Sequence, residues 1–235
     1  YSIRVLWMAN AIQPIDIKKL KYWREINGLS KYGRLTDQAP VGIGDAPHKI
    51  LYYQPDGSLG STASTHISFL PYVHNTDSYG YNAAIVPKGI PYETESWGWL
   101  LDERYHGKVA IVNAPTIGIF DLALAAQAQG LVTFKDMGNM SRAEIDALFE
   151  IVIAKKRQGH FRGVWTSVPH SVELMASGQV VVASMFSPAA SKLNGMGIPC
   201  VYAAPKEGYR AWQGVMCLSR ELHGERLEAA YAFMN

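Results

Sequence analysis

Residues 96–130 read SWGWLLDERYHGKVAIVNAPTIGIFDLALAAQAQG, and this stretch decides the fold class. A tryptophan-rich segment leads to a basic turn, followed by an apolar, β-branched run at Lys108–Asn113 that is typical of a buried strand. Pro115 then begins a run rich in Ala and Leu, which ends at Gly130. Proline in the first turn and glycine after the last are usual for a helix. The stretch predicts a strand followed directly by a helix, and nothing in it indicates catalysis.

The same alternation continues on both sides of this stretch. Asp77-Ser78 and Gly80 suggest a loop and a bulge between two strands. Strands that alternate with helices at this spacing predict an α/β fold with a mostly parallel sheet. The expected helices are Asp16–Ile26, Pro115–Gln129, Ser141–Lys156, Pro169–Ser177, Pro188–Leu193 and Glu225–Met234. The expected strands are Lys49–Gln54, Ile67–Tyr72, Tyr79–Val86, Lys108–Asn113, Phe161–Thr166, Gln179–Phe186, Pro199–Ala204 and Ala211–Leu218.

Composition excludes several classes of protein. The chain has 235 residues, of which 48% are hydrophobic and 18% charged, as in globular proteins. Its net charge of +2 comes without a stripe of basic residues, so no nucleic-acid partner is expected. No apolar run reaches the ~18 residues that a membrane span requires.

Catalytic, cofactor and metal motifs are absent from the sequence. It contains no GxSxG, GxGxxG or Walker A pattern, and its histidines follow neither H-x₃-H nor HExxH spacing. We therefore expect no enzyme activity, no cofactor and no metal site. Cys200 and Cys217 each lie in an apolar run, which leaves open two buried thiols or a disulfide in an oxidising compartment.

Five segments in order resemble one family, the periplasmic solute-binding proteins of ABC importers of the spermidine/putrescine-binding type (extracellular solute-binding protein family 1). The resemblance implies a two-lobed periplasmic-binding-protein fold of type II, with mixed sheets flanked by helices. It places one lobe at 1–84 plus 186–225 and the other at 85–185 plus 226–235, with hinges near 84, 186 and 226. It also implies further β-α units before Tyr1 and a helical segment after Asn235. The segments are AIQPIDIKKL, FLPYVHNTDSYGYN, SWGWLLDERYHGKVAI, MASGQVVVASMFSPAA and PKEGYRAWQGVMCLSRELHGERLEAAYAFMN.

The candidate ligand-binding residues combine this resemblance with their places in the chain. Trp165 ends a strand, where α/β sheets collect ligands, although core packing is the alternative. Arg162 could pair with a carboxylate through its planar fork, or be a surface residue, since it faces opposite to Trp165. Tyr1, Phe186 and Trp212 match family positions that contact ligand. The full set is Tyr1, Asn113, Thr116, Arg162, Trp165, Phe186, Ser187 and Trp212.

The family's acidic ligand positions carry no acid in this chain. They match Asn113–Ile117, Ser187–Ala189 and Gly214. A buried ammonium without a counter-charge is costly, so we expect a ligand with at most one cation, such as an amino acid or γ-amino acid, rather than a polyamine. If a polyamine binds instead, its counter-charge would have to come from Asp77, Asp121 or the segments before Tyr1.

The resemblance implies a non-enzymatic protein that captures a small amine, amino acid or polyamine between its lobes. It implies a signal peptide, a periplasmic location, a monomeric state and an ABC transporter permease in the inner membrane as partner. Two alternatives stay open. One is a ligand sensor of the same fold that docks on a membrane receptor. The other is an enzyme on a related two-lobed scaffold, of the thiamin-precursor or porphobilinogen-deaminase type.

Overall fold

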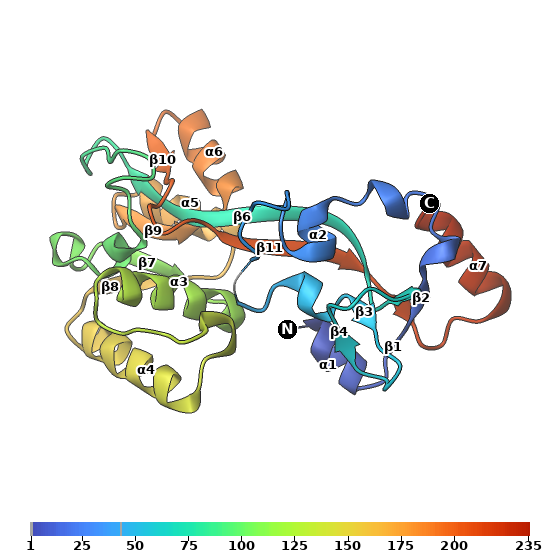
Figure 1. Ribbon diagram of the computed structural model, residues 1–235. Helices are drawn as coiled ribbons and strands as arrows, with labels where there is room; N and C mark the ends of the chain where they lie inside the picture. Colours follow the sequence, from blue (N-terminus) through green and yellow to red (C-terminus); the bar gives the residue numbers. More distant parts are fainter. Residues whose placement is uncertain (1, 43) are drawn as a thin grey trace. The chain divides into compact units, whose positions relative to one another are not determined.

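The computed structural model describes residues 2–42 and 44–235, which form two compact units (Figure 1). Unit 1 comprises residues 1–75 and 213–235, and unit 2 comprises residues 76–212. The chain crosses between them once within β6 (Leu70–Asn82) and once within β11 (Arg210–Met216), and these two strands pair. The mixture of helices and sheets confirms the predicted α/β class.

The bounds of these units differ from those expected for the lobes. Residues 186–212 belong to unit 2, where β10 (Cys200–Tyr202) pairs antiparallel with β6. Residues 226–235 belong to unit 1, because α7 (Gly224–Phe233) contributes Tyr231 to its core. The expected hinges near 84, 186 and 226 each lie inside a unit. The lobe boundaries concern a motion, and they stay a prediction.

Unit 2 is built on a six-stranded sheet of mixed direction. The strand order is β10-β6-β9-β7-β8, with β11 also paired to β6. The strands β9 (Val182–Met185), β7 (Val109–Val112) and β8 (Phe161–Trp165) are parallel, whereas β6 and β10 run antiparallel to their neighbours. The sheet is therefore less parallel than the alternation of elements predicts, because the long strand β6 enters it in the opposite sense.

Two separate cores cover the faces of this sheet. Successive side chains of β7 alternate between them, as they must on a strand: Val109 and Ile111 lie in one core, Ala110 and Val112 in the other. The helices α3 (Pro115–Ala128) and α4 (Arg142–Arg157) contribute to the first core, and α5 (Val168–Ala176) and α6 (Ser187–Gly195) to the second (Figure 1). All four helices were expected, and α4 begins with the predicted capping box of Ser141 and Glu144.

Unit 1 has shorter elements. Its four-stranded sheet has the order β2-β5-β3-β4, and β1 pairs with β12. The helix α7 closes the core, since the Tyr231 hydroxyl accepts the N–H of Asp16 at 2.9 Å. The bounds are α1 (Ser2–Met8), β1 (Ile12–Gln13), β2 (Ile15–Asp16), α2 (Gly28–Tyr32), β3 (Tyr52–Tyr53), β4 (Leu59–Gly60), β5 (His66–Ile67) and β12 (Leu218–Ser219). Short 3-10 turns lie at Ile17–Lys19, Trp23–Glu25 and Pro47–Ile50 in this unit, and at Trp97–Leu101, Glu103–Tyr105 and Met137–Asn139 in unit 2.

The helix expected at Asp16–Ile26 is wrong. Asp16 does cap a first turn, but Leu20 then adopts an extended conformation and buries its side chain, which ends that turn. A second turn follows at Trp23–Glu25, where Trp23 packs edge-on against Tyr52 at 6.4 Å. Tertiary packing therefore overrides an apolar spacing that is compatible with a helix.

The loop expected between two strands at residues 73–78 is also wrong, because β6 runs without interruption from Leu70 to Asn82. Gly80 marks no bulge. A Cβ there would lie 2.6 Å from the sulfur of Met185, so glycine allows β9 to pack closely against β6.

The disulfide alternative does not hold, since both thiols are free. Cys200 lies in unit 2 and Cys217 in unit 1. Burial raises the pKa of each thiol to about 11, so both are protonated at neutral pH.

Candidate functional site

Three parallel strands of unit 2 end at one edge of the sheet, which we call the carboxyl edge. Asn113 follows β7, Trp165 ends β8 and Phe186 follows β9. The N–H of Asn113 donates to the carbonyl of Trp165 at 2.8 Å, which holds the first two ends together. Ligands of α/β sheets bind at such an edge. The structure thus brings together three of the residues that the sequence singles out.

Two helices begin at the carboxyl edge. Among the described residues, no side chain caps the N-terminus of α3 or α6, so the first backbone N–H groups of each helix have no side-chain acceptor there. Thr116 in the first turn of α3 is exposed, and Ser187 at the start of α6 is half-buried. Pro115 and Pro188 carry no N–H, and the N–H groups of Ile117 and Ala189 donate to the carbonyls of Ala114 and Phe186. The N–H groups left for a ligand are those of Thr116 and Ser187, and together with the helix dipoles they favour negative charge, so this edge suits a carboxylate.

The aromatic residues of this edge differ in burial. Trp165 is only 2% exposed, and its indole N–H donates to the carbonyl of Ser184 at 2.9 Å. Phe186 packs edge-on against it with 5.2 Å between ring centroids and is half-buried. The burial of Trp165 agrees with the core-packing alternative, and Phe186 is the ring of this pair that reaches the surface.

Behind the edge lies a buried polar network, formed by Asp77, Asp121, Ser184 and Arg210, which we call the acid network. Arg210 contacts Asp121 at 2.8 Å and Asp77 at 3.1 Å. The Ser184 hydroxyl bonds to Asp121 and accepts the N–H of Val112 at 2.7 Å, which connects the network to β7. Spacing in the sequence could not reveal it, although Asp77 and Asp121 are the acids named there as alternative counter-charges.

The acid network holds two carboxyl groups against one guanidinium. Burial raises the pKa of Asp121 to about 6, even though Arg210 favours its ionised form. With both acids ionised, the network carries one net negative charge in a region where each of its charged side chains is largely removed from solvent. A cluster with one net negative charge stabilises one nearby cation and leaves a second cation without a counter-charge.

Two further predicted residues, Arg162 and Trp212, lie apart from these contacts. Arg162 is exposed on β8 and donates to Gln179 at 2.5 Å, as its surface alternative predicts. Trp212 is 42% exposed on β11, two residues after Arg210. Tyr1 lies outside the described residues.

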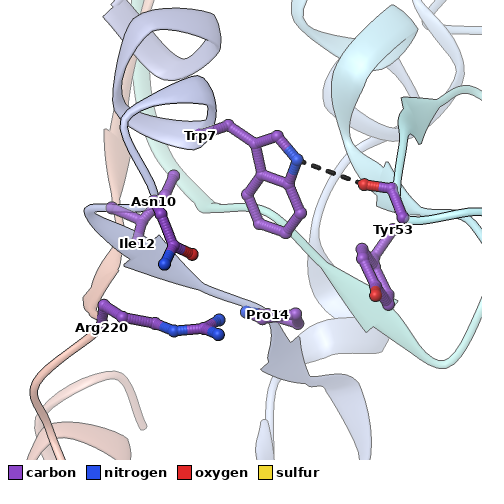
Figure 2. Close-up of a pocket in the computed structure, with 7 residues that line it drawn as sticks. Trp7, Asn10, Ile12, Pro14, Tyr53 and Arg220 are labelled. Atoms are coloured by element: carbon purple, nitrogen blue, oxygen red, sulfur yellow. Dashed lines mark hydrogen bonds between the residues drawn. The ribbon is translucent and has the colours of Figure 1, made fainter.

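Unit 1 contains a pocket that the sequence does not predict (Figure 2). Its volume is about 250 Å³, and Trp7, Tyr53 and Arg220 line it together with Asn10, Ile12, Pro14 and Gly57. The Trp7 indole N–H donates to the carbonyl of Gly57 at 3.3 Å, and the rings of Trp7 and Tyr53 lie 5.5 Å apart. These residues come from three separate stretches of the chain, 7–14, 53–57 and residue 220, so no local motif identifies the pocket.

Side chains that could ligate a metal ion lie at the opposite end of the parallel strands. Glu103, His106 and His160 each offer a ligand atom there, all within 4.8 Å of one another. The sequence-based expectation of no metal site rests on local spacing, which does not detect residues this far apart in the chain.

Comparison with known proteins assigns the fold. A family model described as bacterial extracellular solute-binding protein matches residues 6–235. Among solved structures, the chain is similar to the spermidine/putrescine ABC transporter substrate-binding protein PotD of Streptococcus pneumoniae, with 16% identity and a TM-score of 0.62 over 100% of this chain and 59% of that one. It is also similar to a putative spermidine/putrescine ABC transporter of Listeria monocytogenes, with 16% identity and a TM-score of 0.64 over 100% of this chain and 59% of that one. The TpPotD lipoprotein of Treponema pallidum is similar with 14% identity and a TM-score of 0.62, over 99% of this chain and 61% of that one.

At these identities the likeness shows the fold alone, and it confirms the predicted periplasmic-binding-protein type II class. The chain spans about three fifths of the length of these structures. No curated protein matches the chain.

Proposed function

We propose that this chain, which belongs to the bacterial extracellular solute-binding protein family, is part of the solute-binding component of an ABC importer. Two of the similar structures carry the names of ABC transporter proteins. Solute-binding proteins of such importers bind small molecules and work with permeases. The permease of the inner membrane is therefore the proposed partner, and the proposed ligand is a small molecule.

The proposed ligand is a small zwitterion with a single ammonium, such as an amino acid or γ-amino acid. The charge of the carboxyl edge carries this proposal. Two uncapped helix N-termini there favour a carboxylate, and the acid network behind them supplies one net negative charge. A second ammonium would have no counter-charge at the edge, and its desolvation costs several kcal/mol. The polyamines named for the similar structures are therefore not the ligands we propose for this chain.

Individual residues have distinct roles in this proposal. Asn113, Thr116 and Ser187 hydrogen-bond the ligand carboxylate, because they lie at the helix N-termini of the edge. Phe186 and Trp212 provide aromatic contacts, since both expose part of their rings. Trp165 supports Phe186 from the core.

Family membership also bears on location and on the alternatives. We propose a periplasmic, monomeric protein with no catalytic role and no nucleic-acid partner, because members of the family are extracellular solute-binding proteins. Within the described residues, every helix is too short or too polar to span a bilayer. No observation among these residues favours the sensor or the enzyme.

A thermal-shift screen of the full chain tests the ligand class. γ-Aminobutyrate, glutamate, putrescine and spermidine are added over a range of concentrations, and the melting temperature is recorded. A ligand stabilises the native state by RT ln(1 + [L]/Kd), which is about 2.7 kcal/mol at one hundred times Kd. We expect the zwitterions to raise the melting temperature and the polyamines to leave it unchanged. A larger rise with spermidine or putrescine would refute the proposed ligand class.

Substitution of one aromatic residue tests the site. Trp212→Ala should weaken binding of the active zwitterion by about 1–3 kcal/mol, because the ligand would cover the exposed part of its ring. Tyr22→Ala is the matched control, because Tyr22 is 43% exposed and lies in unit 1. Equal affinities of the two variants would remove Trp212 from the site.

A further inference from the structure

The amino-terminal ends of β7 and β8 carry a group of metal-binding side chains. Glu103 and His106 lie in the lead-in to β7, and His160 directly precedes β8. The N–H of Gly107 donates to the carbonyl of His160 at 2.8 Å, so the backbone fixes the two histidines beside each other. Their rings are 5.7 Å apart, and one ligand atom from each of the three side chains lies within 4.8 Å of the others.

His160 has an unusual environment for a histidine in a globular protein. Its side chain is 0% exposed, and its Nε2 lies 3.0 Å from the carbonyl oxygen of Leu100. A carbonyl only accepts, so Nε2 carries the proton and Nδ1 of the neutral ring presents a lone pair. Nδ1 is buried and has no hydrogen-bond partner among the residues that the structure describes.

This arrangement is the one found around histidines that ligate metals. A histidine that ligates a metal through one nitrogen almost always donates its other N–H to a carbonyl or carboxylate, which fixes the tautomer and the ring. Here the carbonyl of Leu100 accepts the N–H of His160 Nε2. A buried lone pair without a donor is otherwise a cost to the fold, since buried polar atoms are nearly always paired.

We propose that Glu103, His106 and His160 bind a divalent first-row transition metal ion of the zinc class, with water completing the coordination. The donor set has two imidazole nitrogens and one carboxylate oxygen, which suits Zn²⁺ and disfavours Ca²⁺ and Mg²⁺ because these prefer oxygen ligands alone. Binding would connect the lead-in of β7 to that of β8.

The ligand atoms must move together to bind the ion. In a tetrahedral site with metal–ligand bonds of about 2.1 Å, two ligand atoms lie about 3.4 Å apart. The three ligand atoms here lie within 4.8 Å of one another, so they are more widely spaced than a bound ion requires. His160 is held in the core, whereas the side chains of Glu103 and His106 are 63% and 45% exposed. The two exposed side chains can therefore rotate toward the fixed one.

Lys155 competes with the ion. Its ammonium pairs with one oxygen of Glu103, while the other oxygen lies 3.2 Å from Nδ1 of His106. A divalent cation next to this ammonium is repelled, and the lysine withdraws charge from the carboxylate. Asp102 does not substitute for Glu103, because Arg104 holds it with a contact of 2.7 Å. Removal of Lys155 should therefore strengthen metal binding, whereas removal of a ligand should weaken it.

Titration of the chelator-stripped full chain with Zn²⁺ at neutral pH, followed by calorimetry, tests the site. Glu103→Gln and His106→Gln should each weaken binding at least about tenfold, and Lys155→Gln should tighten it severalfold. Both ligand substitutions are at exposed positions, so the fold is retained. Co²⁺ provides a second readout, since its visible absorption reports imidazole ligation and should be lost in His106→Gln.

His223→Gln is the matched control, because His223 is exposed and lies in unit 1. It should leave the affinity unchanged. An affinity that is unaffected by Glu103→Gln and His106→Gln, or that falls equally in His223→Gln, would overturn the proposal. Weaker binding in Lys155→Gln would likewise contradict it, because the lysine would then support the ion.

Discussion

The two ends of the parallel strands in unit 2 differ in the charge that they favour. At the carboxyl edge, two helices begin without side-chain caps and an acid network lies behind them. At the amino-terminal ends, α4 finishes just before β8, and Glu103, His106 and His160 gather there. In our proposals, one edge therefore presents backbone donors to a carboxylate, and the other presents side-chain lone pairs to a cation.

This difference follows from the polarity of the fold. In a strand-helix unit, the helix that follows a strand begins at that strand's carboxyl end, and the helix before the next strand ends at its amino end. The helix dipoles therefore point their positive ends to one edge and their negative ends to the other. Side chains add to this pattern: Lys155, Lys156 and Arg157 in the last turn of α4 offset the negative end of its dipole.

The largest effect is expected from Arg210→Met, which breaks the acid network. The substitution leaves two buried carboxyl groups without their cation, and a broken buried pair costs about 3–5 kcal/mol of unfolding free energy. Urea denaturation measures this cost at pH 8, which is above the pKa of about 6 that burial gives Asp121. Arg162→Met is the control at an exposed site and should cost less than about 0.5 kcal/mol. Equal costs would mean that the network does not distinguish the carboxyl edge energetically.

The next largest effect is the pH dependence of stability that Asp121 causes. Its pKa in the folded protein, about 6, is above the ordinary value of 3.8. The folded state therefore binds this proton more tightly than the unfolded state. The resulting stability is fully present below the ordinary pKa and is lost as the pH rises through about 6.

The wild type should therefore lose about 2–3 kcal/mol of stability relative to Asp121→Asn between pH 4 and pH 7. Other carboxyl groups titrate in both proteins and cancel in the difference. Unfolding free energies of the two proteins across this range provide the measurement. A constant difference would show that Asp121 does not titrate there.

Trp165→Phe tests the support of the carboxyl edge. The substitution removes the indole N–H that donates to Ser184 and part of a fully buried ring. We expect a loss of about 1–2 kcal/mol of unfolding free energy. Trp212→Phe makes the same chemical change at a half-exposed position and should be nearly neutral. Comparable losses in both variants would contradict the burial difference between the two rings.

The smallest effect is expected from Ser187→Asp. A carboxylate at the start of α6 should stabilise the protein by about 0.5 kcal/mol through the helix dipole. The same charge should abolish binding of a zwitterion whose carboxylate occupies that position. Ser187→Asn is the neutral control and should do neither. Stabilisation without loss of ligand would place the ligand away from this helix.

Sequence patterns predict the two units unequally. The four helices of unit 2 have clear boundaries, such as the Ser141 cap of α4 and Pro115 at the start of α3, and each lies close to its expected bounds. Unit 1 consists of two-residue strands and short turns, whose stability comes from tertiary contacts such as that between Trp23 and Tyr52. The helix expected at Asp16–Ile26 fails for this reason.

Sequence patterns also predict some parts of the candidate sites and miss others. Asn113, Trp165 and Phe186 lie at strand ends, so the order of elements alone brings them to one edge. The acid network joins Arg210 to a carboxyl group 89 residues away, and the group of Glu103, His106 and His160 depends on the register of β7 against β8. Neither pattern is visible in local spacing, which is why the sequence predicts no metal site and leaves Asp121 only as an alternative.

The two crossings in β6 and β11 have a consequence for the order of folding. Unit 2 is one continuous segment, whereas unit 1 needs both residues 1–75 and residues 213–235. Gln13 donates to the carbonyl of Ser219, 206 residues later, so the partner of β1 is synthesised long after β1 itself. Contacts this distant in sequence form slowly. During synthesis, unit 2 therefore has all its residues before unit 1 does, and the N-terminal segment must wait with its apolar residues exposed, a state in which aggregation and chaperone binding compete with folding.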